Sequence, residues 1–295
     1  MKKPVKLSKK NLKIFWYWIN ERHRIYLKRK KGKSFPWTED KILRTYKFTN
    51  VFRLLDRVTQ ELLKRVFTKK NLKRDLSTIV FNIVKFRMFN WPETYDELGG
   101  FSKRWDEKDA IKKLRQRQKR KQKVFTGAYI ITNNGLKEEK IVLVCRSLTA
   151  IYKDRKRIAK KIVKYPRIED WVEMFSEFPM IGRFIAYELA TDVRYLAKYK
   201  VIPEPKDTYT WANAGPGAFR GLNRLHKRDL HTRISIGQAV KEMQALLYKS
   251  KDRLENHVPR LEMRDIEHSL CEYDKYMRVK TKEGRPRSKF VPYKN

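Results

Sequence analysis

The sequence predicts a mainly α-helical protein, and three observations lead to that prediction. Apolar residues recur at steps of three and four along most of the chain, the spacing that places them on one face of a helix. Hydrophobic residues make up 41% of the 295 positions, enough for a core in one large domain or in two lobes. Segments with glycine or proline, such as residues 31–36 and 203–205, separate the periodic stretches.

The helices follow from this periodicity in chain order. The first is expected at residues 12–30, where Phe15, Trp18 and Ile19 share one face. Thr38 is placed to cap the next, because the acidic residues that follow it suit the positive end of a helix dipole. Residues 76–89 are rich in β-branched side chains, so a strand is the alternative there. Further helices are expected at residues 51–67, 148–163, 168–178, 183–199, 218–225, 236–254 and 265–277.

A small β-hairpin is expected near residues 128–145. The apolar residues 128–132 lead into Asn133-Asn134-Gly135, a turn signal, and a second apolar run occupies residues 140–144. Residues 281–295 form a basic segment that we expect to be a flexible tail.

The charge of the chain points to a polyanionic partner. Lys and Arg number 72 against 33 Asp and Glu, for a net charge of +39. Such an excess repels itself unless a polyanion neutralises it, so DNA or RNA is the expected partner. An anionic membrane surface is the rival, but the sequence has no amphipathic anchor, lipidation site or apolar run of about 18 residues. Two cysteines far apart in sequence are compatible with a reducing cytoplasm.

Two segments are candidates for contact with a nucleic-acid backbone. Residues 178–182 form a short turn between two expected helices, and such a turn directs backbone N–H groups and a helix dipole toward an anion. An ordinary corner between helices is the alternative. The second segment is the charged block between Asp106 and Lys123, which is either a solvated helix face or an element that follows phosphates. The DNA-binding candidates are Met180, Ile181, Gly182, Arg183, Lys119, Arg120 and Lys121.

The block at residues 48–57 contains a candidate anion site. If the block is helical, then Asn50, Arg53 and Arg57 share one face and offer an amide and two guanidinium groups, which suit phosphate or carboxylate recognition. The alternative is an ordinary surface pair between Arg53 and Asp56.

Polar residues embedded among aromatic ones mark a second candidate. Arg87 and Asn90 lie in an aromatic and methionine-rich segment that ends at Trp91 and Pro92. Such an element could stack on an extruded base and hydrogen-bond to it. A core corner closed by Trp91 is the alternative.

A glycine-rich loop precedes the helix expected at residues 218–225. Gly215 and Gly217 flank Pro216, and exposed N–H groups at a helix start can hold an oxyanion or a pyrophosphate. The loop is not a P-loop, because no Gly-Lys-Ser/Thr follows it. A plain tight turn is the alternative.

The segment at residues 265–276 supplies carboxylates for acid–base chemistry. Glu267 and Glu272 lie on neighbouring faces of the expected helix, and a carboxylate near a cation can act as a general base or bind an amine. His268 has no partner at metal-ligand spacing, and no cluster of ligands calls for a metal.

Taken together, the blocks at residues 48–57, 214–218 and 267–275 resemble the α-glutamyl/putrescinyl thymine pyrophosphorylase family of bacteriophages, also called amino acid:DNA transferases. The resemblance runs from about residue 16 to residue 278. It implies an enzyme that acts in the cytoplasm of an infected bacterial host, on double-stranded DNA in which 5-hydroxymethyluracil has been pyrophosphorylated. The enzyme would displace pyrophosphate with an amine such as glycine, glutamate or putrescine, to give a hypermodified thymine.

The family is related to helix–hairpin–helix DNA glycosylases, which implies a two-lobed catalytic unit over residues 1–280 around a basic cleft, with its hairpin at residues 178–182. The hairpin here lacks the first glycine of the glycosylase turn. Phe184 stands where lyase-type members carry a Schiff-base lysine, so that mechanism is excluded at this position. Asp207 is the match for the glycosylase aspartate if a short insertion is allowed.

These candidates define an expected mechanism. Arg53, Arg57 and the loop at Gly215–Gly217 would hold the leaving group, Arg87 and Asn90 the base, and Glu267, Glu272 or Asp56 would accept the proton of the amine. No cofactor is required, although a divalent metal is compatible with pyrophosphate. The alternative functions are a DNA N-glycosylase that uses Asp207 and a DNA-binding protein without catalysis.

Overall fold

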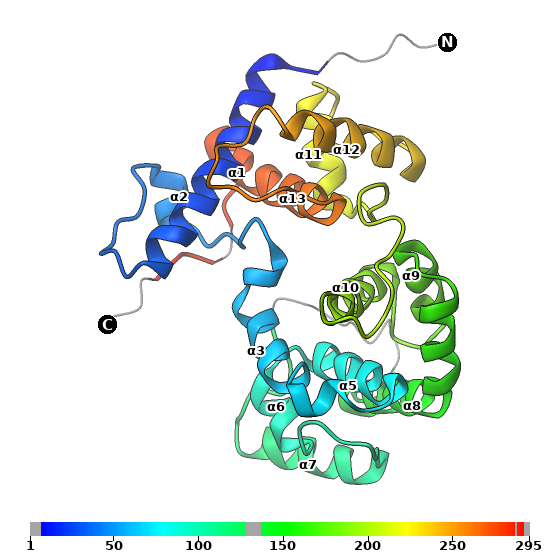
Figure 1. Cartoon of the computed structure of the whole chain (residues 1–295). Helices are drawn as coiled ribbons and strands as arrows, with labels where there is room; N and C mark the ends of the chain where they lie inside the picture. Colours follow the sequence, from blue (N-terminus) through cyan, green and yellow to red (C-terminus); the bar gives the residue numbers. More distant parts are fainter. Residues whose placement is uncertain (1–6, 128–136, 287, 292–295) are drawn as a thin grey trace. The chain divides into compact units, whose positions relative to one another are not determined.

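The computed structural model describes residues 7–127, 137–286 and 288–291. Regular structure within these ranges consists of thirteen α-helices and two 3₁₀ helices. An isolated antiparallel β-bridge joins Tyr46 to Lys289. The prediction of a mainly α-helical fold is confirmed. The chain divides into two compact units, one formed by Met1–Asp56 with Thr208–Asn295 and the other by Arg57–Asp207 (Figure 1).

The first unit is organised around one long helix near the C-terminus, α13. Its capping box, in which the side chains of Glu262 and Asp265 each accept a backbone N–H, fixes where the helix begins. Apolar side chains along α13 are buried against the other helices of the unit. The helices of the first unit are α1 (Lys9–Lys30), α2 (Lys41–Thr45), η1 (Arg53–Leu55), α11 (Pro216–Leu225), α12 (Ile236–Ser250) and α13 (Met263–Lys280).

Glycines allow α11 to pack closely on α13. A Cβ atom at Gly217 would overlap the sulfur of Cys271, and one at Gly221 would lie 2.5 Å from the carbonyl oxygen of Leu270. Because these two glycines are four residues apart, they lie on the same face of α11. The backbones therefore approach more closely than any side chain at these positions would permit.

The C-terminal segment is held to the first unit at residues 288–290. The N–H of Lys47 donates to the carbonyl of Ser288, and the N–H of Phe290 donates to the carbonyl of Thr45. The Phe290 ring also lies 5.8 Å from that of Trp37. These backbone and aromatic contacts are not indicated by the basic residues nearby, and the flexibility expected over residues 281–295 stays a prediction.

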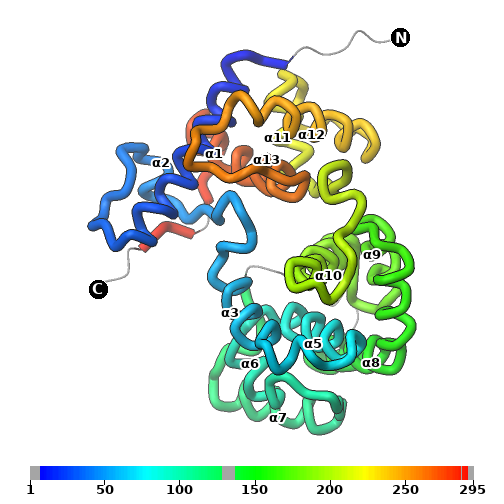
Figure 2. Tube along the Cα trace, viewed as in Figure 1, coloured from blue at the N-terminus to red at the C-terminus, as the bar shows by residue number. Residues whose placement is uncertain are grey.

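The second unit is built around α5, a helix buried on all sides. From Ser77 to Phe89 every residue of α5 is buried, and the helix contacts α3, α6, α8 and α10 (Figure 2). The prediction of a helix there is confirmed, because a helix buried all round can be apolar and β-branched on every face. The helices of this unit are α3 (Arg57–Val66), α4 (Lys69–Leu72), α5 (Leu76–Phe89), α6 (Pro92–Glu97), α7 (Glu107–Lys119), α8 (Lys140–Lys164), α9 (Ile168–Ser176), α10 (Arg183–Arg194) and η2 (Tyr195–Tyr199).

Three expectations about local structure are wrong. Residues 140–144 begin α8 rather than a strand, because their apolar residues continue the helical spacing through Leu148 and Ile151. The first strand of that expected hairpin, with its turn, lies mostly in residues 128–136, outside the described part of the chain. Residues 51–56 contain a 3₁₀ turn and not the start of a long helix. Asp40, not Thr38, caps α2, accepting from the N–H groups of Ile42 and Leu43.

The glycine seam gives a stability prediction. Gly221→Ala places a methyl group against backbone that cannot move aside, so we expect a loss of about 1–3 kcal/mol in the free energy of unfolding. Gly237→Ala on α12 is the matched control, because its new methyl group meets nothing within 4 Å. We expect the control to be neutral or to stabilise by up to about 1 kcal/mol. Urea denaturation measures both, and equal stabilities would show that the seam tolerates a side chain.

Candidate functional site on helix α13

Helix α13 carries three buried carboxylates, each engaged with a different segment of the first unit. Glu267, Glu272 and Asp274 are all at most 7% exposed. Their partners come from α11, from the loop that precedes η1, and from α13 itself. All three sequence blocks on which the family resemblance rests therefore contribute residues to the surroundings of one helix, although Arg57 starts the second unit.

The loop before η1 is attached to α13 through Thr49. Its N–H donates to Oε2 of Glu272 at 3.1 Å, and its hydroxyl lies 2.6 Å from Nε2 of His268. Lys275 binds the same carboxylate at 2.7 Å. Burial alone would raise the pKa of Glu272, but the charges of Lys275 and His268 and the Thr49 N–H together lower it. Glu272 is therefore held as a carboxylate.

Asp56 follows η1, and its pKa is shifted in the opposite direction to that of Glu272. The carboxyl is half-buried and accepts the N–H of Asn50 at 3.0 Å. Removal from water raises its pKa to about 6, and the negative charge of Glu272 adds to the rise, while the Asn50 N–H, Arg22 and Arg53 oppose it. Asp56 therefore exchanges its proton near neutral pH, as a general base must.

A buried arginine of α1 organises this loop. Nη2 of Arg22 donates to the side chain of Asn50 at 2.8 Å and to the carbonyl of Phe48 at 3.3 Å. Its Nη1 atom is buried and makes no hydrogen bond within the described residues. Asn50, expected to bind an anion, is therefore committed to the loop, with its amide nitrogen on the carbonyl of Leu55.

The expected helical face of Asn50, Arg53 and Arg57 is not present. Asn50 lies in a loop, Arg53 is 2% exposed in η1, and Arg57 is exposed at the start of α3 in the other unit. The face required a continuous helix, and that helix is interrupted at Asp56. Arg53 nevertheless lies close enough to Asp56 to affect its pKa.

The glycine-rich loop before α11 faces a carboxylate of the protein itself. Oε1 of Glu267 lies 3.5 Å from the backbone nitrogen of Gly215, and its Oε2 is 2.9 Å from Arg264. Gly217 is required by the contact with Cys271. The geometry thus favours a turn shaped by packing over the expected pyrophosphate cradle, because a second anion at Gly215 would be repelled by Glu267.

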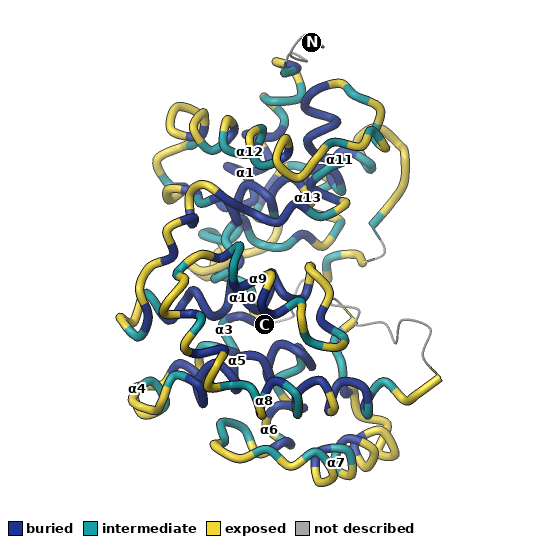
Figure 3. The backbone as a smooth tube through the Cα atoms, turned by 90° about the vertical axis from the view of Figure 1, so that its right-hand side faces the viewer, coloured by how far each residue is buried: buried dark blue, intermediate teal, exposed yellow. Residues whose placement is uncertain are grey.

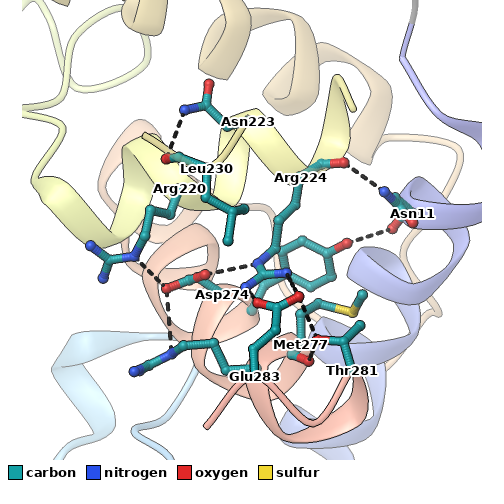
Figure 4. Close-up of polar contacts among 11 residues, drawn as sticks. Asn11, Arg220, Asn223, Arg224, Leu230, Asp274, Met277, Thr281 and Glu283 are labelled. Atoms are coloured by element: carbon teal, nitrogen blue, oxygen red, sulfur yellow. Dashed lines mark hydrogen bonds and ion pairs between the residues drawn. The ribbon is translucent and has the colours of Figure 1, made fainter. Parts of the chain in front are cut away.

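Asp274 is the centre of an arginine cluster (Figure 4). Its Oδ2 lies 2.8 Å from Nε of Arg220 and 3.7 Å from Nε of Arg278, and its Oδ1 lies 2.8 Å from Nε of Arg224. Arg224 also pairs with Glu283. The cluster joins α11, α13 and the turn that follows α13.

In the second unit, Arg87 and Asn90 form a buried network. Arg87 binds Asp192 through Nε at 2.6 Å and Nη2 at 3.1 Å, and it donates to Asn90 at 2.6 Å. All three residues are at most 2% exposed. Asn90 also ends α5 in a left-handed conformation. The contacts give the pair a structural task, and its role in holding a base stays a prediction.

The turn at residues 178–182 joins α9 to α10 as a helical hairpin. Met180 adopts a positive φ of 65°, and the Ser147 hydroxyl of α8 donates to the carbonyl of Pro179 at 2.5 Å. Gly182 and Arg183 are exposed, whereas the side chain of Ile181 is buried. Lys119, Arg120 and Lys121 are also exposed, at the end of α7 (Figure 3). DNA binding by either segment stays a prediction.

Asp207 caps α9. Its Oδ1 accepts the N–H of Ile168 at 2.7 Å, and its Oδ2 accepts the N–H of Glu169 at 3.0 Å. These are N–H groups that a helix start otherwise leaves without partners. The residue thus has a structural function whether or not it also acts in catalysis.

No group of three or more His, Cys, Asp and Glu side chains in the described residues is arranged to hold a metal ion. Among the helices that the structure describes, none has the length and apolar character needed to cross a bilayer.

Comparison with known proteins places the chain in a family. Residues 9–285 match the family model described as 5-hmdU DNA kinase, helical domain. The chain belongs to this family. It is also 30% identical, over 294 aligned residues, to a protein named 5-hmdU DNA kinase from Bacillus phage SP10. The alignment covers 88% of this chain and 44% of that relative, so the chain spans less than half of the relative's length. No solved structure matches significantly.

The family match agrees in part with the resemblance seen in the sequence. Both concern phage enzymes that modify thymine-type bases through 5-hydroxymethyluracil in DNA. The matched family is described by a kinase and not by an amine transferase, so the exchange reaction is not supported by the match.

Sequence reasoning missed several residues of this site. Arg22 and His268 contact the loop before η1 only through tertiary packing, which periodicity does not report. A signal existed for the arginine cluster, because Arg220 and Arg224 are four residues apart on α11, as Asp274 and Arg278 are on α13.

The position of Asp207 gives a test of its structural role. Asp207→Asn replaces one of the two acceptor oxygens by a donor, so we expect a loss of about 1–2 kcal/mol in the free energy of unfolding. Asp252→Asn, at an exposed position after α12, is the control and should change stability by less than about 0.5 kcal/mol. Thermal unfolding of both variants measures this, and an unchanged melting temperature for Asp207→Asn would contradict the capping role.

Proposed function

We propose that this chain binds double-stranded DNA and presents 5-hydroxymethyluracil for modification, inside a phage-infected bacterial cell. The observation that carries the proposal is the family match over residues 9–285. The printed name of the Bacillus phage SP10 relative states that it is a kinase acting on 5-hmdU DNA. The net charge of +39 supports a DNA partner.

The residues of this chain support a role on the DNA side of such a reaction. A P-loop needs Gly-x-x-x-x-Gly-Lys-Ser/Thr between a strand and a helix. Gly32-Lys33-Ser34 resembles the end of that pattern, but Leu27 stands at the first glycine position and the segment follows α1, not a strand. These residues therefore do not form a P-loop.

A row of lysines on α8 is the surface best suited to a DNA backbone. Lys153, Lys156, Lys160 and Lys164 are exposed, and no ion pair is formed by any of them within the described residues. Their steps of three and four residues place them on one side of α8, at intervals of about 4.5–6 Å along its axis. The opposite side of α8, including Leu148, Ile151 and Ile158, is buried. We infer that this row follows phosphates of a duplex.

The lysine row gives a quantitative test of DNA binding. Each phosphate contact contributes about −0.9 to the slope of log Kobs against log salt concentration. Changing Lys153, Lys156, Lys160 and Lys164 to Gln should therefore make the slope shallower by about 3–4 units. Fluorescence anisotropy with a duplex containing 5-hydroxymethyluracil, at several salt concentrations, measures the slope.

The control removes the same charge elsewhere. Lys9, Lys10, Lys13 and Lys30 are exposed on α1, and changing them to Gln lowers the net charge equally. We expect a smaller change in slope for this variant. If both variants change the slope equally, the α8 row is not a specific contact, and if the native protein fails to bind the duplex, the proposed function is wrong.

Exchange of pyrophosphate for an amine on the base is a second candidate, favoured by the state of Asp56. In this reaction the amine nitrogen forms a bond to the 5-methylene carbon, the carbon–oxygen bond to pyrophosphate breaks, and pyrophosphate leaves. The ammonium form of the amine must first lose a proton, and a carboxylate whose pKa is raised to about 6 can accept it. The charges of Arg22 and Arg53 favour the ionised form of Asp56 and so limit the rise of its pKa.

Asp56→Asn separates this role from a structural one. We expect the rate of amine incorporation to fall about 100-fold and its rise with pH near 6 to disappear. Stability should not fall at pH 7. The folded protein binds the Asp56 proton more tightly than the unfolded chain does. Ionisation of Asp56 therefore lowers the stability of the protein as pH rises from about 4 to 6, and an amide at this position avoids that loss.

The assay uses DNA that contains pyrophosphorylated 5-hydroxymethyluracil, with glycine, glutamate and putrescine as donors and mass spectrometry of the nucleosides. A rate equal to that of the native protein would exclude Asp56 as the base. The absence of any new nucleoside with the native protein would exclude the exchange reaction.

A further inference from the structure

The arginine cluster around Asp274 contains more positive charge than its carboxylates neutralise. Three guanidinium groups, those of Arg220, Arg224 and Arg278, meet the two carboxylates of Asp274 and Glu283. Asp274 is 1% exposed, so its charge is stable in the fold only if arginines remain beside it.

All three nitrogen atoms of the Arg224 guanidinium contact carboxylates of the protein. Its Nε binds Asp274 at 2.8 Å, and its Nη1 binds Glu283 at 3.2 Å while Nη2 contacts the same carboxylate. Its side chain is 6% exposed. This residue joins α11, α13 and the turn after α13, and it shares its charge between Asp274 and Glu283.

Arg220 and Arg278 are held in a different manner. Each approaches the same oxygen of Asp274 through Nε, which leaves the Nη groups without a hydrogen bond or ion pair within the described residues. Their side chains are 34% and 38% exposed. Figure 4 shows the outer end of the Arg220 guanidinium turned away from Asp274. Arg220 is thus hydrogen-bonded to Asp274 through Nε, whereas Arg278 meets the same carboxylate as an ion pair and its buried Nε makes no hydrogen bond within the described residues. Both guanidinium groups keep open Nη donors on their outer side.

The helices that carry these two arginines are packed closely together. Gly217 and Gly221 fix α11 against α13, so the two arginines project from helices that cannot slide apart. A guanidinium already held by a buried carboxylate loses little further freedom when it binds a ligand. Planar donor forks match the oxygens of a phosphate group, to which arginine binds in a bidentate manner.

We propose that Arg220 and Arg278 form a binding site for a phosphoryl or pyrophosphoryl group. The site deepens the proposed function by naming a phosphate-bearing ligand on the first unit. It replaces the loop at Gly215–Gly217, where Glu267 would repel such an anion. Two sources supply this chemistry, namely the phosphate backbone of DNA and a phosphorylated substituent on the base.

The experiment measures binding of inorganic pyrophosphate to the full chain by isothermal titration calorimetry. The test variant is Arg220→Gln with Arg278→Gln, which leaves Arg224 and Asp274 in place. We expect pyrophosphate to bind the native chain and its affinity to fall at least tenfold in the variant. Arg146→Gln with Arg157→Gln is the matched control, because these arginines are exposed on α8 and each pairs with a carboxylate. The control should retain native affinity.

Thermal unfolding shows whether the variant folds. If the double Gln variant is unstable, Arg220→Lys with Arg278→Lys replaces it, because lysine keeps the charge beside Asp274 but loses the bidentate fork. We expect that variant also to bind pyrophosphate more weakly than the native chain.

A second measurement identifies the source of the phosphate. Loss of both pyrophosphate and unmodified duplex DNA binding in the variant supports the site and assigns it to the DNA backbone. Loss of pyrophosphate binding alone supports the site and assigns it to a phosphorylated base. No pyrophosphate binding by the native chain, or equal affinity in native and variant chains, would overturn the proposal. Because pyrophosphate binding needs no modified DNA, this result is independent of whether the proposed function is correct.

Discussion

The close packing of α11 on α13 is the constraint on which the first unit depends. Gly221 has room for a hydrogen atom and nothing larger against the carbonyl of Leu270. This approach sets the distance at which Arg220 and Arg224 meet Asp274, and it places the start of α11 beside Glu267. The loop before η1 then attaches to the same helix through Thr49 and Glu272. The arrangement of charges in the first unit thus depends on Gly217 and Gly221, which carry no side chain.

A net charge of +39 makes the placement of the acidic residues important. The buried carboxylates Glu267, Glu272 and Asp274 are each paired with cations, which offsets their desolvation. Other carboxylates pair with arginines at the surface, as Glu139 does with Arg115. In contrast, the lysine row of α8 forms no ion pair with an acidic side chain in the part of the chain that the structure describes. Such an uncompensated row is costly in an isolated protein and favourable when a polyanion is bound.

The sequence predicted the parts of the fold that depend on local periodicity. The helices at residues 76–89 and 236–254 were expected close to where α5 and α12 lie, because an apolar face or core at helical spacing is a local property. The errors occur where tertiary contacts decide. Residues 51–56 have helical spacing but turn at Asp56, whose carboxyl accepts the Asn50 N–H and closes the loop. Residues of the blocks at 48–57, 214–218 and 267–275 meet around α13. The partners of each residue, such as Arg22 for Asn50, depend on segments distant in sequence.

The structure also separates carboxylates that the sequence left as equivalent candidates for a general base. Glu267 is paired with Arg264 and faces the Gly215 N–H. Glu272 has a lowered pKa because Lys275, His268 and the Thr49 N–H all stabilise its charge. Removal from water raises the pKa of Asp56 to about 6, and the negative charge of Glu272 adds a smaller contribution to the rise. Two neighbouring carboxylates whose environments move their pKa values apart have different chemical capacities. Asp56, whose pKa lies near neutral pH, is the one suited to move a proton, whereas Glu272 stays ionised.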